Sequence, residues 1–500
     1  MQKKQLTLVI VSLLVVVLSV SLAYFTAQII GKGKDVSVTS ANLQIVFTDS
    51  DGAISGSNIE PGWSDTKTFT IKNDTKTEYK YNIVIKDLLN TFVTTGYLQY
   101  KITSTNGGYN MTEFKDVPKS SAAKDKMLAY SVVIPNGVTQ SYTIEFKYAN
   151  DESVDQSIDM GKKLSGTLFI TEGTEPTLLS QLLADKSTVL TRTDFSTNLM
   201  NDNTNTLYTS TEDSKTVYYF AGNPTDNWVK FGKNASNQDL YWRIIRTNSD
   251  GSVRLLYHST STTAENAYIA NDTKFNTTDK DPMYVGYMYG TSNATAIDRS
   301  NTNNSTIKTV IDNWYKSNLE AKGYTKYLST TAVYCNDRSI TEGTYNIDSS
   351  FNYAVRTRLD TNTTPSYDCA TTEDKFTVDK STGNGKLTYP IALMTADEVV
   401  FAGGKDAAAW YYYNSVRGKS STGNTWWWLL SPHDWTGGKY SYASVSLVKA
   451  DSYGQLYDYE VDSRYTGVRP AISLKSCVKY SSGDGTVSDP YTIKETTSGC

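Results

Sequence analysis

Apolar and polar residues alternate along several stretches between residues 35 and 171, and this period-two pattern limits the fold more than any other feature. The clearest stretches are VSVTSANLQIVFT, TKTFTIKND, YKYNIVIKDL, LAYSVVIP, SYTIEFKYA and LSGTLFITEG. Turn-forming pairs such as Pro61-Gly62 and Asn136-Gly137 separate several of them. Short alternating strands at this spacing are typical of a β-sandwich, which we predict for residues 31–172.

The length and net charge of the chain exclude several classes of function. A chain of 500 residues is too long for one compact domain. Lys+Arg 48 against Asp+Glu 52 gives a net charge of −4, which argues against a nucleic-acid partner. His258 and His433 are the two histidines, and two histidines are too few for most histidine-based metal sites and catalytic mechanisms. We therefore predict no metal, no cofactor and no catalytic residue.

The N-terminus indicates export. Lys3 and Lys4 precede an apolar run from Leu6 to Ala23, which continues to Ile30. This run approaches the roughly 20 residues of a membrane span and exceeds the roughly 7–15 of a signal-peptide core. Small residues nevertheless permit cleavage after Ala23. Residues 1–30 are thus a membrane anchor, acting through residues 6–30, or a cleaved signal segment, and the protein is expected at the cell surface or secreted.

The cysteines agree with an extracellular location. Four cysteines allow three pairings. The C-x-x-C spacing that would indicate a metal or redox site does not occur. Sequential pairing closes two local loops, so we predict disulfides Cys335–Cys369 and Cys477–Cys500.

Motifs near the N-terminus resemble those of a known family. The apolar run ends near an aromatic pair, and ANLQIVF and NIEPGWSDTKTFTIKND follow it. This order resembles the camelysin/TasA family of secreted bacterial surface and matrix-fibre proteins over about residues 1–170. The resemblance implies a sandwich that serves as a stalk or as a polymerising fibre subunit, although the long second half departs from that family.

The second half of the chain has a different pattern of apolar and polar residues. Residues 173–205 read as a linker with a short helix after Pro176, and residues 206–500 read as an α+β domain dominated by antiparallel strands. A hairpin turn is predicted at 248–251, a helix opening at Ser305, and a helix with a capping box formed by Thr395 and Glu398.

Several separate motifs of residues 206–500 also carry a resemblance. YWRIIR, DGSVRLLY, LMTADEVVFAGG, WWWLLSP and GVRPAISLKS occur in an order similar to uncharacterised surface domains of Firmicutes and Mollicutes. Their pattern resembles the C-type-lectin-like fold used by formylglycine-generating enzymes. The overall expectation is a mostly β protein with some α: membrane helix, β-sandwich, then a C-type-lectin-like domain. The cysteine pair that the enzymes need is missing, so enzymatic function is not implied.

The segment from Tyr440 to Tyr465 is the predicted binding surface. It holds six Tyr, five Ser and three Asp, a composition typical of adaptable binding faces. The alternative is that it shares the Tyr- and Ser-rich composition of the whole chain. Trp242, Trp427 and Arg469 are predicted to be structural. The candidate ligand-binding residues are Trp435, Tyr440, Tyr442, Asp451, Tyr453, Tyr457, Asp458, Tyr459, Asp462 and Tyr465.

The sequence predicts a cell-surface binding protein or adhesin whose partner is a protein or glycan on another cell, host or phage. Lectin-like domains of this resemblance serve as scaffolds for diversification by reverse transcription, and the Tyr-, Ser- and Asp-rich segment contains no Asn. The resemblance therefore implies a retroelement-target variable region. The rival expectation is a structural fibre subunit.

Overall fold

The computed structural model describes residues 36–500 except 41–42, 50–53, 57–58, 75–76, 174, 187, 200–202, 265–266, 343, 406–425, 450–454 and 465. The expected membrane or signal segment, residues 1–30, lies outside the described residues. Among those that are described, the helices are too short or too polar to cross a bilayer. The fold is mostly β, as predicted, and the chain forms two compact units that meet between Glu175 and Pro176.

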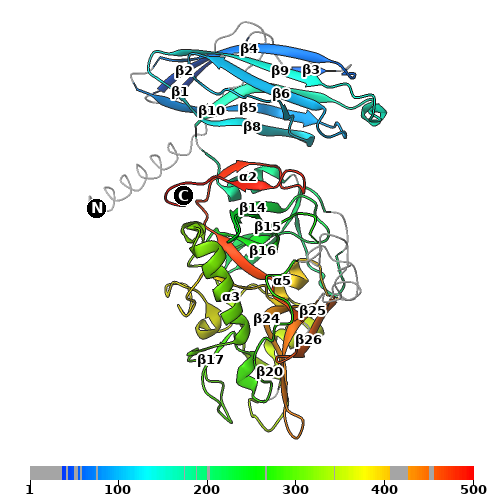
Figure 1. Ribbon diagram of the computed structural model, residues 1–500, viewed down its shortest axis with the longest axis vertical. Coiled ribbons are helices and arrows are strands. Elements are labelled where there is room, and N and C mark those ends of the chain that lie inside the picture. Colours follow the sequence, from blue (N-terminus) through cyan, green and yellow to red (C-terminus); the bar gives the residue numbers. More distant parts are fainter. Residues whose placement is uncertain are drawn as a thin grey trace, which may run out of the picture. The chain divides into compact units, whose positions relative to one another are not determined.

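The first unit consists of two antiparallel sheets (Figure 1). One sheet contains, in spatial order, β1 (Val36–Ser40), β2 (Leu43–Asp49), β4 (Ser64–Asn73), β9 (Thr139–Tyr148), β6 (Leu98–Thr105) and β7 (Lys115–Asp116). The other contains β3 (Ile54–Gly56), β10 (Leu164–Glu172), β5 (Tyr79–Asn90) and β8 (Ser120–Ile134), and a 3₁₀ turn, η1 (Ser157–Asp159), precedes β10.

Alternation explains the core of this unit. Phe69 and Ile71 on β4 and Ile144 on β9 point into the same apolar cluster as Ile83 and Ile85 on β5, and all five are at most 2% exposed. Both sheets therefore bury one face each against a common core.

The second unit is built around a larger branched sheet. Its main path contains β11 (Thr188–Thr191), β12 (Thr206–Glu212), β13 (Lys215–Tyr219), β15 (Asp239–Thr247), β14 (Trp228–Lys233), β30 (Tyr491–Ile493) and β29 (Tyr480–Ser482). From β15 a branch continues through β16 (Val253–Ser259) and β28 (Pro470–Leu474) to β23 (Ile391–Leu393). Residues expected to form a linker thus contribute β11 to this unit.

A second sheet of this unit carries the Tyr-rich segment. It contains β20 (Ile340–Glu342), β21 (Phe351–Tyr353), β24 (Trp426–Thr436), β25 (Tyr442–Lys449) and β26 (Gln455–Glu460), and β27 (Thr466–Gly467) pairs with β24. Two short ribbons are formed by β17 (Met288–Tyr289) with β18 (Asn303–Asn304), and by β19 (Tyr334–Cys335) with β22 (Lys375–Phe376).

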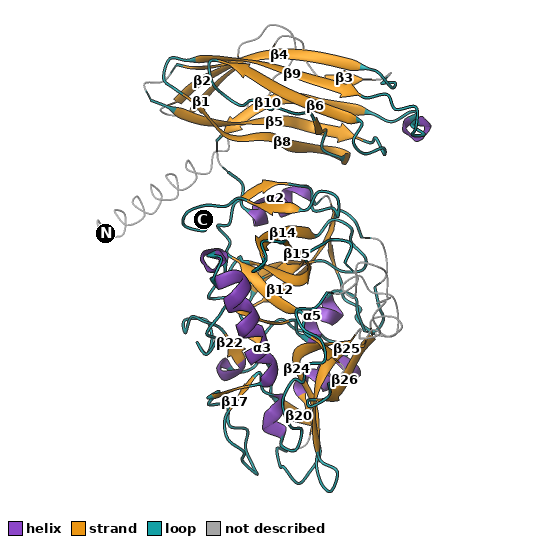
Figure 2. Ribbon diagram, in the orientation of Figure 1, coloured by secondary structure: helices purple, strands orange, loops and turns teal. Residues whose placement is uncertain are grey.

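The helices are short, and Figure 2 shows the longer ones in the second unit. They are α2 (Leu178–Asp185), α3 (Thr306–Tyr315), α4 (Ala354–Arg356) and α5 (Ala396–Phe401), with π turns η3 (Lys316–Glu320) and η5 (Thr357–Thr361) and 3₁₀ turns η2 (Pro282–Val285), η4 (Tyr324–Tyr327) and η6 (Thr372–Asp374). As predicted, Ser305 caps α3, and Thr395 with Glu398 forms the capping box of α5.

Both predicted disulfides are present in the second unit. The Cα atoms of Cys335 and Cys369 lie 5.7 Å apart, and those of Cys477 and Cys500 lie 5.2 Å apart. Each bond closes a local loop, with sequence separations of 34 and 23 residues.

Candidate functional site

The pairing of β25 with β26 decides which side chains can act together. Tyr459 lies opposite Val445, Asp458 opposite Ser446, and Tyr457 opposite Leu447. Because successive strand residues point to opposite faces, Tyr457 and Tyr459 share one face and Asp458 points to the other. The predicted binding residues of β26 are therefore divided between two faces of the sheet.

The first face carries an aromatic cluster, Trp426, Tyr457 and Tyr459. Tyr457 is 41% exposed and Tyr459 is 38% exposed, while Trp426 is half-buried. The Trp426 ring lies 6.3 Å from that of Tyr457 and 5.4 Å from that of Tyr459, between centroids. Rings at these separations restrict one another, so the cluster offers a rigid amphipathic surface.

The opposite face carries a histidine–carboxylate cluster, His433, Asp360, Asp434 and Asp458. His433 Nδ1 lies 3.3 Å from Asp434 Oδ2 and 3.5 Å from Asp458 Oδ2. Its Nε2 lies 3.4 Å from Asp360 Oδ2. The cluster joins three elements, because Asp360 belongs to η5, His433 and Asp434 to β24, and Asp458 to β26.

The surrounding carboxylates determine the charge of His433. Burial alone would lower the pKa of the imidazole, but the contacts with Asp360 and Asp434 and the charge of Asp458 outweigh burial and raise it to about 9. His433 is therefore protonated at neutral pH. Burial raises the pKa of the Asp458 carboxyl, whereas hydrogen bonds from His433 and Ser444 outweigh burial and lower that of Asp434.

A cavity of about 220 Å³ opens beside the histidine–carboxylate cluster. Its wall combines apolar residues with polar ones and includes one member of the aromatic cluster. The lining residues are Val355, Leu359, Leu456, Arg356, Asp360, His433, Ser446, Asp458 and Tyr457. Apolar and charged side chains thus converge on one cavity, and such a combination suits a small polar ligand.

Arg356 places a second positive charge at this cavity. Its Nη1 donates to Asn352 Oδ1 at 3.0 Å and to Asp434 Oδ2. Ser444 donates to the other oxygen of Asp434. Asp434 is thereby fully engaged, while Asp360 and Asp458 face the cavity with His433 between them.

The wall formed by α4 and η5 is fixed from the interior. Arg358 donates to both carboxylate oxygens of Asp397 at 2.8 Å and to Asp337 Oδ2 at 3.1 Å. A bidentate arginine–carboxylate pair holds both position and orientation. Asp397 lies in α5, so this helix positions the segment that carries Arg356 and Asp360.

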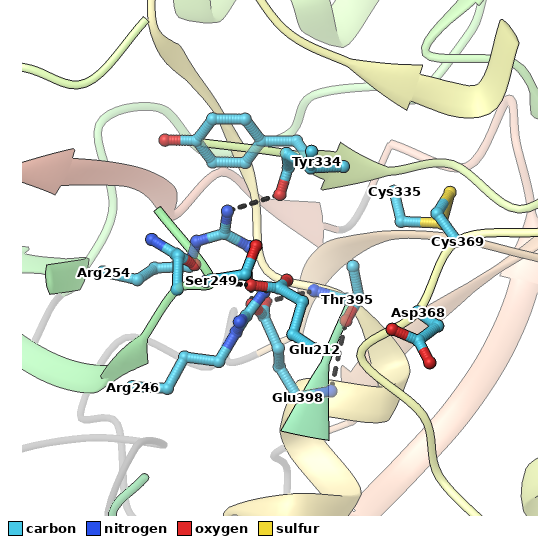
Figure 3. A network of polar contacts seen from close by, with 12 residues as sticks. Glu212, Arg246, Ser249, Arg254, Tyr334, Cys335, Asp368, Cys369, Thr395 and Glu398 are labelled. Atoms are coloured by element: carbon cyan, nitrogen blue, oxygen red, sulfur yellow. Dashed lines mark hydrogen bonds and ion pairs between the residues drawn. A yellow bond between two sulfur atoms is a disulfide. The ribbon is translucent and has the colours of Figure 1, made fainter. Parts of the chain in front are cut away.

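Glu398, the next residue of α5, is the centre of a buried ion network (Figure 3). Its Oε1 accepts from Arg246 Nε at 2.8 Å and from Arg254 Nη1 at 2.6 Å. Arg246 also donates to Glu212 Oε1 at 2.8 Å. These charged side chains are at most 5% exposed. The network therefore fixes α5 against β15 and β16, and through α5 it supports the cavity wall.

Among the described residues, two groups of three side chains bring metal-type ligand atoms within 4.8 Å of one another. One is His433, Asp434 and Asp458, whose negative charge is balanced by Arg356 and by the proton on His433. The other group contains Asp279, which pairs with Lys280 at 3.0 Å, and also includes Glu460 and Asp462. In each group, a cation of the chain itself thus contacts at least one carboxylate.

The remaining predicted residues are dispersed. Tyr440 is 76% exposed in the turn between β24 and β25, and Tyr442 is half-buried at the start of β25. Asp462 is half-buried, 3.7 Å from Lys274 Nζ. Trp435 is 1% exposed and donates to Ile347 O at 3.0 Å, so it is a core residue that cannot contact a ligand directly. The predicted residues Asp451, Tyr453 and Tyr465 lie outside the described residues.

The three residues predicted to be structural all lie in the core. Trp242 is fully buried and donates to Phe231 O at 2.8 Å. Arg469 donates to Tyr257 O, and its guanidinium carbon lies 4.8 Å from the centre of the Trp427 ring. Trp427 is fully buried.

Sequence reasoning missed His433, Arg356, Asp360 and Trp426. His433 stands in the run Ser431-Pro432-His433-Asp434, where Ser431 Oγ accepts a hydrogen bond from Ala396 N. A histidine followed directly by an aspartate in a Tyr-rich strand was the available signal. Arg356 and Asp360 carry no such signal in the sequence, because tertiary packing alone brings them to the site.

Comparisons with known proteins add little. No family model matches the chain, and no curated protein matches it. One matching solved structure, described as "AvmM Catalyzes Macrocyclization in Alchivemycin A Biosynthesis", aligns with 30% of this chain and 100% of its own at 9% identity and a TM-score of 0.15. A likeness of this size supports no conclusion about fold or function.

Proposed function

We propose that the chain is a cell-surface binding protein whose second unit holds a ligand at the aromatic cluster and the adjoining cavity. The observation that carries this proposal is the position of Tyr457, which belongs to the exposed cluster and also lines the cavity. A ligand could therefore contact aromatic surface and polar groups of the cavity at once. Exposed aromatic residues beside a pocket are typical anchors of binding energy.

The charge state of His433 favours binding over catalysis. An imidazole with a pKa of about 9 holds its proton at neutral pH and cannot accept another from a substrate. It can donate hydrogen bonds and balance the carboxylates that face the cavity. The cluster therefore suits recognition of a polar ligand.

The remaining parts of the proposal rest on the sequence. The first unit would act as a stalk, residues 1–30 as an anchor, and the second unit as a lectin-like head. The exposed residues of the edge strand β26 would be the positions that tolerate diversification, since surface substitutions usually change stability by less than about 0.5 kcal/mol.

The test uses the full chain, labelled and applied to arrays of glycans and of surface proteins. Truncating an anchoring aromatic residue typically costs about 2 kcal/mol or more, roughly a 30-fold loss of affinity. Tyr457→Ala and Asp458→Asn should therefore abolish any specific signal.

Tyr440→Ala is the matched control, because Tyr440 is more exposed but lies in a turn outside the cluster. A signal that survives Tyr457→Ala and Asp458→Asn, or that is lost only with Tyr440→Ala, would refute the proposed site. Filaments formed by residues 31–172 alone, without array binding by the full chain, would favour a fibre subunit instead.

A further inference from the structure

A buried lysine–aspartate pair joins two distant segments of the second unit. Lys186 follows α2, and Asp226 lies in the loop before β14. Lys186 Nζ lies 2.6 Å from Asp226 Oδ2, and the two side chains are 1% and 4% exposed. Because Oδ2 is bonded to the carboxyl carbon, the nitrogen already lies close to the atom that it would attack.

The surroundings of this pair are aromatic. Lys186 Nζ lies 5.5 Å from the centre of the Phe220 ring and 5.6 Å from that of Tyr491. Burial is costly for two separated charges, and transfer of a proton from the ammonium to the carboxylate would remove both charges. That transfer yields a neutral amine, which is a nucleophile, and a carboxylic acid, which is an electrophile.

The two oxygens of Asp226 are in different environments. Oδ2 accepts a hydrogen bond from the backbone N–H of Asn205 at 2.7 Å. Asn205 adopts a left-handed conformation, with φ of 60°, that aims this N–H at the carboxylate. Oδ1 is buried, and no described residue donates a hydrogen bond to it. A fixed donor on one oxygen can stabilise negative charge that develops there, while the other oxygen is left to depart.

A second carboxyl group, that of Asp185, lies at the neighbouring Tyr491. Asp185 is 6% exposed and accepts a hydrogen bond from the Tyr491 hydroxyl at 3.0 Å. Burial, and then the charges of Asp185 and Asp226, raise the pKa of Tyr491 well above its ordinary value. Both carboxylates therefore act on the same phenol, so Tyr491 connects Asp185 to the lysine–aspartate pair.

We propose that Lys186 and Asp226 condense to form an intramolecular amide. Nζ of the neutral amine attacks the carboxyl carbon of Asp226, and the negative charge that forms on Oδ2 is held by Asn205 N–H. Oδ1 already carries the proton that the carboxylate took from the ammonium; Asp185 takes a second proton from the nitrogen and delivers it to Oδ1, which leaves as water while the Oδ2 anion re-forms the carbonyl. The ammonium and carboxylate are thus replaced by one amide and one water molecule, with no oxidant or cofactor. This modification does not depend on the proposed binding function.

The amide would join two segments that are 40 residues apart in the sequence. It would be insensitive to reductants, unlike the two disulfides, and would remove two charges from the interior. A protein held outside the cell gains from a link that redox conditions cannot open.

The test is peptide mapping of the reduced full chain by mass spectrometry. The expected result is one cross-linked peptide containing both Lys186 and Asp226, lighter than the sum of its parts by one water, about 18 Da. Asp226→Asn should give the same link with loss of ammonia instead, about 17 Da. Finding Lys186 and Asp226 in two separate unmodified peptides of the wild-type chain would overturn the proposal without any variant.

Lys308 and Asp312 provide an internal comparison. Lys308 Nζ lies 2.5 Å from Asp312 Oδ2, and Lys308 is fully buried. Asp226 also accepts a hydrogen bond from Asn205 N–H, whereas among the described residues Lys308 alone donates to the Asp312 carboxylate. This pair should stay unlinked. Asp185→Asn should slow formation of the link in a time course, and Asp185→Glu should restore it. A link at both pairs would overturn the roles given to Asn205 and Asp185.

Discussion

Replacing Glu398 by Gln tests whether the buried ion network supports the second unit. Glu398 is 1% exposed, and its Oε1 accepts from both Arg246 and Arg254. Glutamine keeps the shape and the capping position but removes the charge. Arg246 retains Glu212, whereas Arg254 loses its carboxylate partner. Removing one partner of a buried ion pair costs about 3–5 kcal/mol.

This cost should appear as a lower melting temperature of one unit only. Differential scanning calorimetry of the full chain should resolve the units, since each has its own core. A loss of 1 kcal/mol shifts the midpoint by about 2–4 °C in a domain of about 150–250 residues, and by about 2 °C in a unit as long as residues 176–500. We therefore expect the second unit to melt roughly 5–10 °C lower in Glu398→Gln, with the first unit unchanged.

The pH dependence gives a second measurement. Burial raises the pKa of Glu398, but Arg254 and Arg246 outweigh burial and lower it below its usual value. A carboxyl group whose pKa is lower in the folded state stabilises the protein at pH values above its unfolded-state pKa. This stabilisation is lost as the pH falls through the folded-state pKa. Glu398→Gln should remove this part of the acid sensitivity. Glu373→Gln, at an exposed position of the same unit, is the control. A midpoint shift no larger than that of the control would refute the argument.

Three further predictions concern other parts of the chain. Cys335→Ser should cost about 2–5 kcal/mol of unfolding free energy by opening the loop to Cys369, and an equal wild-type midpoint with and without reductant would contradict this. Because the pKa of His433 is raised to about 9, its contribution to stability should be complete below pH ~6.5 and lost as the pH rises through 9; His433→Gln should flatten that part of a pH–stability curve. N-terminal sequencing of the membrane fraction should find residues 1–30 retained, and a mature N-terminus at Tyr24 or later would exclude an anchor.

Features governed by local chemistry were predictable from the sequence. The turn between β15 and β16 forms at 248–251, where Gly251 has φ of 79° and its N–H donates to Asn248 O. Thr395 stands three residues before Glu398, and the capping box forms there. In each case, residues within one turn of one another determine the conformation, so sequence spacing is sufficient evidence.

The candidate site depends on contacts that sequence spacing does not reveal. Composition pointed to the segment 440–465, but the register with β25 places Tyr457 and Asp458 on opposite faces. Trp435 is buried because β21 pairs beside it, with Phe351 opposite. The cavity needs Asp360, which is 73 residues from His433 in sequence. Such contacts follow from tertiary packing, and no local sequence pattern predicts them.

The start of the second unit pairs with residues near its last strands. Thr177 bridges Lys479, Leu178 N donates to Val478 O at 2.8 Å, and Tyr480 N donates to Pro176 O at 3.0 Å. A unit whose opening segment is hydrogen-bonded next to its closing one can be cut out or inserted elsewhere without pulling its ends apart. The second unit should therefore tolerate transplantation into a surface loop of an unrelated carrier, and a circular permutant that joins these two segments and opens an exposed loop should still fold. Selection could exchange such a module between proteins as one block of coding sequence.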